Sequence, residues 1–474
     1  MSAEAQILLV VGAYLALNLF VGWRAARSAS DSATGFVAGD RSMGPVLMYF
    51  VTGATIFSAF AFLGAPGRAF STGAAAFHIL AFGVLGFLPF YWTGPAAARL
   101  GRRKGYITQA ELVAGELSFR PLAPVMAVVS LLAFVPYLAL QMRGAGHVLE
   151  VLTSGAMSVE VGAAVVYGVV LLYVWHSGVM GVGWTNTLQG LFMMIMAWSL
   201  GLYLPRALHG SVGEMFRAID PEFLRLPGGA AQEGERWSWL GYGSSVFVMA
   251  AGFSFWPHLF QKAFAARSER VIRRTVVLYP TFQLFLLPIL LIGFAAVGFT
   301  PAPEQADQVL PHLLLQLDLP ALLIGLFCAG ALAASMSSGD AILHSAASIL
   351  VRDGWIVGAK RSLSPEAERR AVRWMLLPIL VISYVTAVSF HEDLVGLLSY
   401  AYGPMGQLAP PVLAALFWKR ATGIAALLGL LLGSAATLGW PHLMPPSDLH
   451  PGLPGLAVNA AVILVVSLMT SRRA

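Results

Sequence analysis

The stretch ALAASMSSGDAILHSAAS, residues 331–348, contains five serines, an aspartate and a histidine. It directly continues the apolar segment PALLIGLFCAG of residues 320–330, so its polar groups belong in the middle of a membrane helix. Hydroxyl, imidazole and carboxylate groups in hydrocarbon are costly unless they bind an ion, a solute or one another. The fold and the function therefore depend on what these groups bind.

The composition predicts a membrane protein. Of the 474 residues, 58% are hydrophobic and only 11% are charged, so a soluble fold would lack the polar residues needed to cover its surface. Stretches of about 20 apolar residues recur along the chain, as transmembrane helices require. The single cysteine, Cys328, lies in one of these stretches, so no disulfide is expected.

Hydropathy predicts thirteen spans, and the charges predict their orientation. The spans start near residues 6, 44, 73, 122, 157, 184, 238, 274, 319, 372, 394, 421 and 453. With the N-terminus outside, the cytoplasmic side holds 23 Lys and Arg against 5 on the other side, and Lys262 is counted with the cytoplasmic group. The positive-inside rule thus places the N-terminus out and the C-terminus in.

The distribution of charge also bears on other classes of protein. The net charge of +6 reflects basic residues at helix ends, which argues against nucleic-acid binding. The N-terminal QILLVVGAYLALNLFVGW is expected to be a retained helix, because it is too long for a signal peptide and lacks a basic start. The longest extramembrane segment, 207–236, has the character of a solvated loop, so no separate domain is expected.

Two predicted spans are interrupted by small residues and proline. The second, MGPVLMYFVTGATIFSAFAFLGAPGRAF (43–70), contains Gly53 and Ser58, and the seventh, YGSSVFVMAAGFSFWPHLFQKAFAARS (242–268), contains Gly252 and Pro257. Such residues permit unwinding in mid-membrane, although close helix packing is an alternative explanation. Matching breaks five helices apart predict an inverted-repeat transporter with its site at the midplane of the bilayer.

This layout gives an all-α membrane protein with a single transmembrane transporter domain over residues 1–474. Its expected parts are an extra first helix at about 6–26, repeat one at about 44–206, repeat two at about 238–418, and C-terminal helices at about 421–472.

A pair of serines in the opening stretch predicts a cation site. Ala334, Ser337 and Ser338 are spaced i, i+3 and i+4, so they share one helix face. Two hydroxyl oxygens suit a small hard cation, and carbonyls of an unwound neighbour, around Ala54 and Phe57, could complete its shell. The alternative is that both serines bond back to carbonyls of their own helix.

Four segments in order resemble the sodium:solute symporter family: SAFAFLGAPGRAF (58–70), GVGWTNTLQG (181–190), PHLFQKAFAARS (257–268) and AASMSSGDAILHSAASILVRD (333–353). A fifth, GPMGQLAPPVLAALFWKRATG (403–423), resembles the Pro-rich tenth core helix of that family. The resemblance implies a LeuT-like fold with thirteen helices in the cell membrane. It also implies symport by alternating access, with a sodium ion as the cofactor and no catalytic residues.

The resemblance further implies a ligand set for sodium, which comprises the carbonyls of Ala54, Phe57 and Ala334 and the hydroxyls of Ser337 and Ser338. Asp340 points off this face, so we expect it to act with Asn186 in gating or ion exit. Many family members have an aspartate where Asn186 stands in WTNTLQ, and some have an acidic residue where Ile56 stands. The site then lacks a carboxylate, which an anionic substrate would supply, and proton coupling stays an alternative.

Arg143 is the one basic residue expected inside the membrane. A buried guanidinium costs about 2.5–3.5 kcal/mol on insertion scales, so it should face a cavity or a partner. Its planar fork suits a carboxylate, although an ion pair with Glu150 is the alternative. The segment YLALQMRGAG (137–146) resembles the monocarboxylate and acetate-type branch of the family. We therefore predict a small monocarboxylate as substrate, such as lactate, pyruvate, acetate or alanine.

Other residues expected to line the substrate pocket are Thr55, Ser58, His78, Gln141, Ser254, Phe255 and Tyr402. The expected partners are the solute and the lipid bilayer, without nucleic acid or an obligate protein partner. The main alternative within transport is a carrier of an amino acid or another polar solute. An intramembrane hydrolase built on Ser338, Asp340 and His344 is disfavoured, because these side chains point in different directions on one helix and the chain has no GxSxG.

Overall fold

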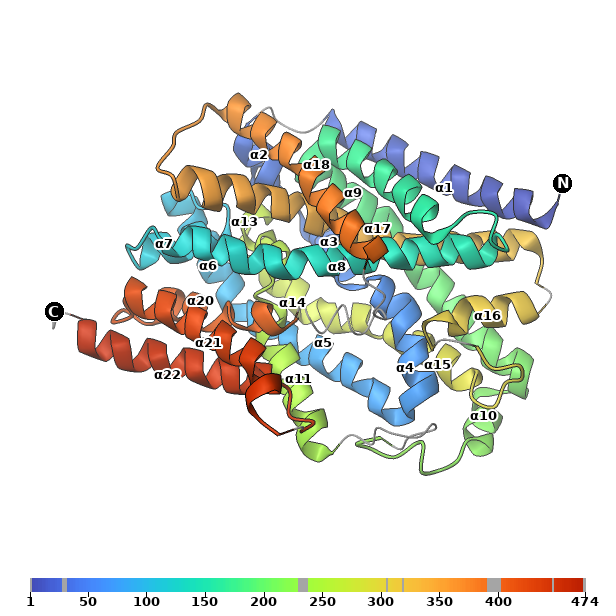
Figure 1. The fold of residues 1–474 in the computed structure, drawn as a ribbon. Coiled ribbons are helices and arrows are strands. Elements are labelled where there is room, and N and C mark those ends of the chain that lie inside the picture. Colours follow the sequence, from blue (N-terminus) through green and yellow to red (C-terminus); the bar gives the residue numbers. More distant parts are fainter. Residues whose placement is uncertain are drawn as a thin grey trace.

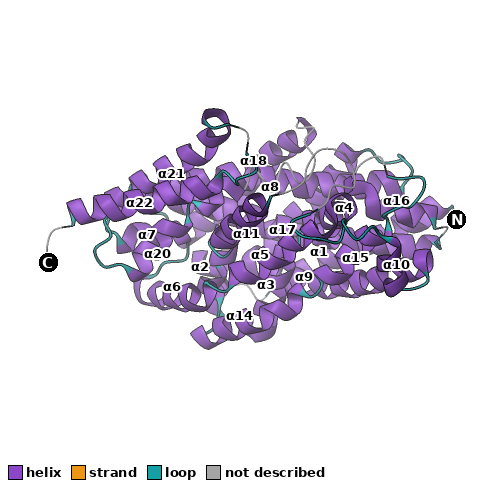
Figure 2. Cartoon of the chain, turned by 90° about the horizontal axis from the view of Figure 1, so that it is seen from below, coloured by secondary structure: helices purple, strands orange, loops and turns teal. Residues whose placement is uncertain are grey.

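The structure is a computed structural model, and it describes residues 2–27, 32–228, 238–303, 306–317, 319–389, 402–445 and 447–471. These residues form a bundle of helices, and the one β-bridge among them joins Met43 to Ala266 (Figures 1 and 2). The α-helices are α1 (Ala3–Ala26), α2 (Ala33–Ala38), α3 (Pro45–Ile56), α4 (Ala65–Thr72), α5 (His78–Phe87), α6 (Phe90–Lys104), α7 (Gln109–Glu116), α8 (Leu122–Leu152), α9 (Val159–His209), α10 (Val212–Ala218), α11 (Trp239–Phe253), α12 (Pro257–Phe260), α13 (Lys262–Ala265), α14 (Glu269–Gln283), α15 (Leu286–Ala295), α16 (Val309–Gln316), α17 (Ala321–Ile349), α18 (Pro365–Ser389), α20 (Ala409–Phe417), α21 (Gly423–Leu443) and α22 (Gly452–Thr470). Short 3₁₀ or π segments are η1 (Gly39–Arg41), η2 (Phe60–Gly64), η3 (Gly73–Phe77), η4 (Ala306–Gln308) and η5 (Leu350–Val357).

The membrane prediction is confirmed. Within the described part of the chain, nine helical stretches are long and apolar enough to cross a bilayer, and α3 and α11 are shorter apolar helices. The predicted spans near 157 and 184 meet in α9, where Gly178 takes a φ of 55° and interrupts the helical path. The first part of the span predicted near 394 falls in residues 390–401, which lie outside the described residues.

Helix α17 is the central element of the bundle. Every residue from Phe327 to Ile349 is buried, because α1, α8 and α9 surround this helix. Its small residues let the neighbours approach closely: a Cβ on Gly339 would stand 2.2 Å from the hydroxyl oxygen of Tyr167 in α9. The polar stretch that opened the sequence is therefore in the core of the bundle, away from lipid.

Both predicted helix breaks are present. Helix α3 ends at Ile56, Phe57 takes an extended conformation (φ −83°, ψ 91°), and a helical path resumes only at Ala59. Helix α11 ends at Phe253, and α12 begins at Pro257 after an extended Trp256 (φ −56°, ψ 125°). These two breaks free backbone carbonyl and N–H groups in the interior of the bundle.

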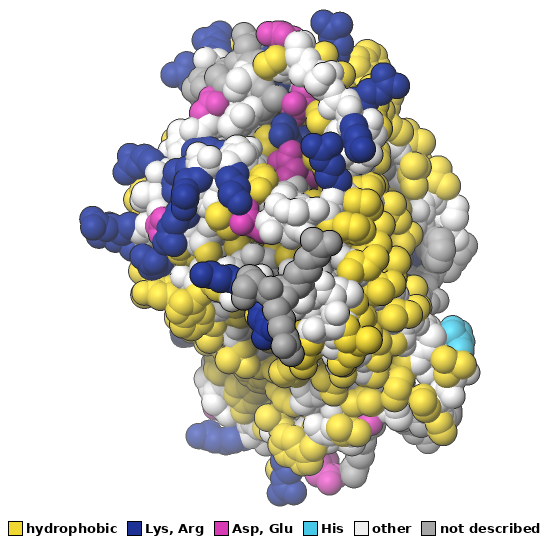
Figure 3. All heavy atoms as spheres, turned by 90° about the vertical axis from the view of Figure 1, so that its left-hand side faces the viewer, with side chains coloured by type: hydrophobic (Ala, Val, Ile, Leu, Met, Phe, Trp, Pro, Cys, Tyr) yellow, Lys and Arg dark blue, Asp and Glu magenta, His cyan; other side chains and the backbone are white. Residues whose placement is uncertain are grey.

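Basic side chains gather at one end of the bundle. The N-terminal end of α1 and the C-terminal end of α22 lie at opposite ends of the molecule (Figure 1). Lys and Arg side chains gather on the end that carries the C-terminus (Figure 3), where the last turn of α6 contributes Arg102, Arg103 and Lys104. A basic end that carries the C-terminus agrees with the orientation that the sequence predicts, with the C-terminus in the cytoplasm.

Candidate functional site

The serine pair of α17 meets the broken end of α3. The Ser337 hydroxyl lies 2.9 Å from the Ala54 carbonyl oxygen and 3.1 Å from that of Ala334. The Ser338 hydroxyl donates to the Thr55 carbonyl at 2.8 Å. Both serine side chains are fully buried. We call this group of hydroxyls and carbonyls the serine niche.

The end of α3 explains why these carbonyls accept bonds from another helix. The Phe57 N–H still donates to the Gly53 carbonyl, but past Phe57 the backbone no longer supplies the N–H groups that would continue the helical ladder. The Ala59 N–H, which would otherwise reach back to Thr55, donates to the Gln141 side-chain oxygen at 2.8 Å. The serine hydroxyls thus bond across two helices, and for Ser338 the alternative of a bond within its own helix does not hold.

Phe57 lies in the break itself. Its ring is buried against Phe282 and Phe285, with ring centroids 5.3 Å and 4.6 Å away. The part of its carbonyl as a cation ligand stays a prediction.

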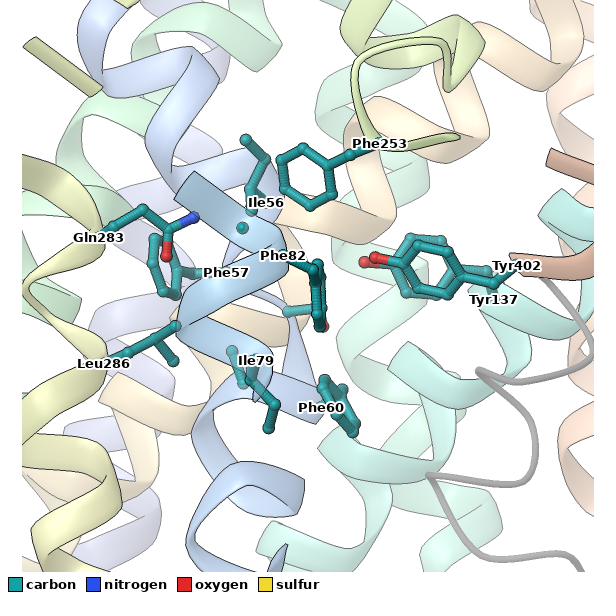
Figure 4. Close-up of a pocket in the computed structure, with 13 residues that line it drawn as sticks. Ile56, Phe57, Phe60, Ile79, Phe82, Tyr137, Phe253, Gln283, Leu286 and Tyr402 are labelled. Carbon is teal, nitrogen blue, oxygen red and sulfur yellow. The ribbon is translucent and has the colours of Figure 1, made fainter. Parts of the chain in front are cut away.

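A small cavity adjoins the break on its other side (Figure 4). Its volume is about 30 Å³, counted as the space open to the centre of a water molecule. Its lining is mainly aromatic and aliphatic, and the polar side chains belong to Ser58, Tyr137, Gln283 and Tyr402. Tyr137 and Tyr402 point their hydroxyls toward the centre from one side, whereas Gln283 approaches from the other. We call this space the central cavity.

Only some of the residues that were predicted to bind the substrate lie at this cavity. Ser58 and Tyr402 line it. His78 lies one layer behind, where its ring contacts Phe82 and its Nδ1 lies 2.9 Å from the Ala75 carbonyl oxygen.

Four further predicted residues lie elsewhere. Gln141 is occupied with the Ala59 N–H, and Thr55 faces away from the lining. Ser254 and Phe255 form the α11 break, where the Phe255 carbonyl accepts a bond of 2.9 Å from Gln109.

Tyr137 and Gln283 line the cavity but were not predicted. A signal for Tyr137 existed, because it stands one helical turn before Gln141 and shares its face of α8.

Arg143 does not reach the central cavity. It is half-buried and lines a separate cavity with His147, Glu160 and Val388. Two residues along α8 from Gln141, its side chain points to another side of the helix. The predicted contact between Arg143 and a substrate carboxylate therefore lacks support from the geometry.

Asp340 and Asn186 form a second polar group beside the niche. The Asp340 carboxylate accepts hydrogen bonds from Tyr173 at 2.8 Å and from Thr185 at 3.2 Å. Asn186 donates to both carboxylate oxygens at 3.0 Å. Asp340 thus faces α9 and not α3, as its position on α17 predicts. Asp340 connects to α3 through Asn186, whose side-chain oxygen lies 3.0 Å from the Thr55 hydroxyl. A ligand set for the cation without a carboxylate stays a prediction.

Lys262 is the main correction to the sequence interpretation. We expected it in a cytoplasmic loop, but it is buried, and its ammonium donates to the Thr55 hydroxyl at 3.2 Å. After the α11 break, α12 and α13 run on through the interior of the bundle and keep Lys262 inside. The sequence did contain a signal, since Lys262 stands within the apolar run LFQKAFAA (259–266). We call Lys262, Thr55, Asn186 and Asp340 the charged network.

Comparison with known proteins extends over almost the whole chain. Residues 36–433 match the Sodium:solute symporter family. An uncharacterized symporter of Bacillus subtilis, YhjB, is 30% identical over 99% of this chain and 98% of its own length. The high-affinity proline transporter PutP of the same organism is 25% identical, covering 95% and 96%. A monocarboxylate transport permease protein of Rhizobium johnstonii is 23% identical, covering 92% and 90%.

A solved structure shares the fold. A Na⁺-coupled sialic acid symporter in a substrate-bound outward-open state superimposes with a TM-score of 0.83 over 98% of each chain, at 19% identity. The predicted all-helical LeuT-like fold is thereby confirmed. The chain therefore belongs to the sodium:solute symporter family, and it is a multi-pass plasma-membrane symporter that couples a small solute to sodium, not an enzyme.

Proposed function

We propose that this symporter couples sodium influx to the uptake of a small monocarboxylate, such as lactate, pyruvate, acetate or alanine. The observation that carries the proposal is the single break in α3, which contributes to both the serine niche and the central cavity. Ala54 and Thr55 face the niche, whereas Ser58 lines the cavity three residues further on. An ion and a solute would thus share one short piece of unwound backbone.

Sodium would be held by the carbonyls of Ala54, Phe57 and Ala334 and the hydroxyls of Ser337 and Ser338. All five ligands are neutral oxygens, the donor type that a small hard cation prefers. In this arrangement the serine hydroxyls donate hydrogen bonds to backbone carbonyl oxygens. A bound cation would instead attract the oxygen atoms of both the hydroxyls and the carbonyls. Binding would then hold α3 against α17 and stabilise one arrangement of the broken helix.

The central cavity suits a solute with one carboxylate and an apolar remainder. The residues that line it carry no charge, so a carboxylate would bond to the Ser58, Tyr137 and Tyr402 hydroxyls. Its charge would be balanced by sodium across the break, which makes the two binding events mutually favourable. Phe82, Phe253 and Ile79 would contact the apolar part. Arg143 has no role in this version of the proposal.

Alternating access would follow from rocking of the two repeats around the shared site. One sodium with one monovalent anion would make the cycle electroneutral. Each additional charge carried inward would gain about 2.3 kcal/mol per 100 mV from the membrane potential. A measurement of current therefore reports directly on the ion count.

One observation favours an amino acid as the second candidate. The Gln283 side-chain oxygen is buried beside the cavity and has no hydrogen-bond partner among the described residues. A substrate amino group would satisfy this acceptor. The similarity to a proline transporter is in line with this candidate, since proline carries an amino group beside its carboxylate.

Uptake into proteoliposomes tests the proposal. Labelled acetate, lactate, alanine and proline are offered with an inward sodium gradient or with potassium in its place. We expect sodium to stimulate uptake of lactate or acetate more than tenfold, and an unlabelled monocarboxylate to compete. If sodium stimulates the uptake of proline alone, the amino acid candidate is established. If uptake of lactate or acetate is independent of sodium and driven by a pH gradient, the proposal that sodium is the coupling ion is wrong.

A further inference from the structure

Two oppositely charged side chains are buried in the interior of the bundle, and the proposed sodium ligands include neither. Lys262 is 7% exposed and Asp340 is 0% exposed. Of the four lysines in the sequence, all within the described residues, Lys262 is the only buried one. A buried charge without a counter-charge costs several kcal/mol, so the two residues need one another or another ion.

Hydrogen bonds connect the two charges through neutral groups. The Lys262 ammonium bonds to Thr55, Thr55 lies 3.0 Å from Asn186, and Asn186 bonds to the Asp340 carboxylate. All the described donors to Asp340 are uncharged: Tyr173, Thr185 and Asn186. Lys262 is the cation that interacts electrostatically with this carboxylate.

Without Lys262 this region would have the chemistry of a cation site. It offers a buried carboxylate together with the oxygens of Thr55, Thr185 and Asn186, which are hard donors. A small cavity lined by Lys262, His258, Gln261 and His344 adjoins it, so water and ions would have space nearby. The ammonium is the positive charge already in place.

We propose that the Lys262 ammonium is a tethered cation that balances Asp340 and keeps a second inorganic cation out of the charged network. Each transport cycle then uses the single sodium of the serine niche. This inference rests on the proposed sodium site, but it concerns a different residue and a different quantity, namely how many ions bind.

Thr55 connects the tethered cation with the serine niche. Its hydroxyl accepts the bond from Lys262, and its carbonyl accepts the bond from Ser338.

An arginine at position 262 keeps the charge, whereas a methionine keeps the length of the side chain and removes the charge. These two substitutions separate the charge of the side chain from its packing.

The test is the number of ²²Na⁺ ions bound at saturation by the purified full-length chain in nanodiscs. We expect one ion per chain for wild type and for Lys262→Arg, and two for Lys262→Met. The double variant Lys262→Met/Asp340→Asn should return to one, since the vacated carboxylate is then absent. A count of two in wild type, or an unchanged count of one in a folded Lys262→Met, would overturn the inference.

A second variant covers the case in which Lys262→Met does not fold. Lys262→Met/Asp340→Asn leaves neither charge buried alone, and it should still bind one ion, because Asp340 binds none in the native state. If this double variant instead binds none while wild type binds one, Asp340 is itself a sodium ligand and the inference is wrong. A wild-type chain that binds no sodium would refute the serine niche as well, so the two failures are distinguishable.

Discussion

The serine niche and the charged network each include side chains from the same stretch of α17, yet they offset the cost of burying polar groups in opposite ways. Ser337 and Ser338 face the broken end of α3 and use only neutral oxygens. Asp340, two residues further on, faces α9 and is surrounded by donors, with Lys262 as counter-charge. A neutral oxygen niche can take and release an ion, whereas a region that contains its own cation has no net charge to offer one.

The largest expected effect comes from removing both hydroxyls of the niche. Ser337→Ala/Ser338→Ala should abolish sodium stimulation of uptake, because two of the five proposed ligands are lost. Loss of ligands or their supports typically costs about 10–100-fold in metal affinity each. Sodium-dependence curves for uptake measure this change.

Ser348→Ala is the matched control for that experiment. Ser348 is buried in the same helix, but its hydroxyl bonds to the His344 carbonyl of that helix at 2.8 Å. Equal loss of sodium stimulation in both variants would mean that any buried serine of α17 matters, and the niche would have no special role.

The charged network predicts a large effect on stability. Asp340→Asn leaves the Lys262 ammonium buried without a counter-charge, which costs about 3–5 kcal/mol in comparable pairs. Lys262→Met/Asp340→Asn removes both charges and should recover most of the loss. The measurement is a double-mutant cycle of thermal stability in detergent. Additive losses would show that the two charges do not interact.

A smaller effect is expected at the central cavity. Tyr137→Phe removes one hydroxyl from the lining and should weaken substrate binding several-fold, since one hydrogen bond contributes about 0.5–1.5 kcal/mol. The apparent affinity for sodium in the absence of substrate should change less than the affinity for substrate, because Tyr137 bonds to Ser338 of the niche as well as to Ser58 of the cavity. If Tyr137→Phe changes sodium binding and leaves substrate affinity unchanged, Tyr137 acts in the niche and not in the cavity.

The smallest effect is expected at Arg143. Because this residue lies outside the central cavity, Arg143→Ala should leave the KM for substrate within about twofold of wild type, a limit that corresponds to roughly 0.4 kcal/mol. Competition of uptake by unlabelled lactate provides the measurement. A tenfold increase in KM would support the contact between Arg143 and a substrate carboxylate that the sequence predicted.

The sequence predicts the features that depend on local chemistry. Gly53 and Ser58 mark the break in α3, Gly252 and Pro257 mark the break in α11, and both breaks are observed. The spacing of Ala334, Ser337 and Ser338 predicts one shared helix face, and both serines do bond to α3. Such features follow from helix geometry, without knowledge of the surrounding elements.

The features that the sequence does not predict depend on how neighbouring helices are placed. Arg143 and Tyr137 lie on the same helix, and only its rotation against α3 decides that Tyr137 faces the cavity. Whether Lys262 leaves the membrane or stays inside depends on the direction of the chain after Pro257, which hydropathy does not encode. With Lys262 moved inside, the charge count still favours the predicted orientation.

The position of the bound cation tests the central claim most directly. Structures determined in nanodiscs in sodium and in potassium would compare the niche and the network within one molecule. We predict density in sodium alone, enclosed by the carbonyls of Ala54, Phe57 and Ala334 and the hydroxyls of Ser337 and Ser338, with Lys262 still bonded to Thr55. Density at Asp340, or a serine pair that stays bonded to the α3 carbonyls in sodium, would contradict the account.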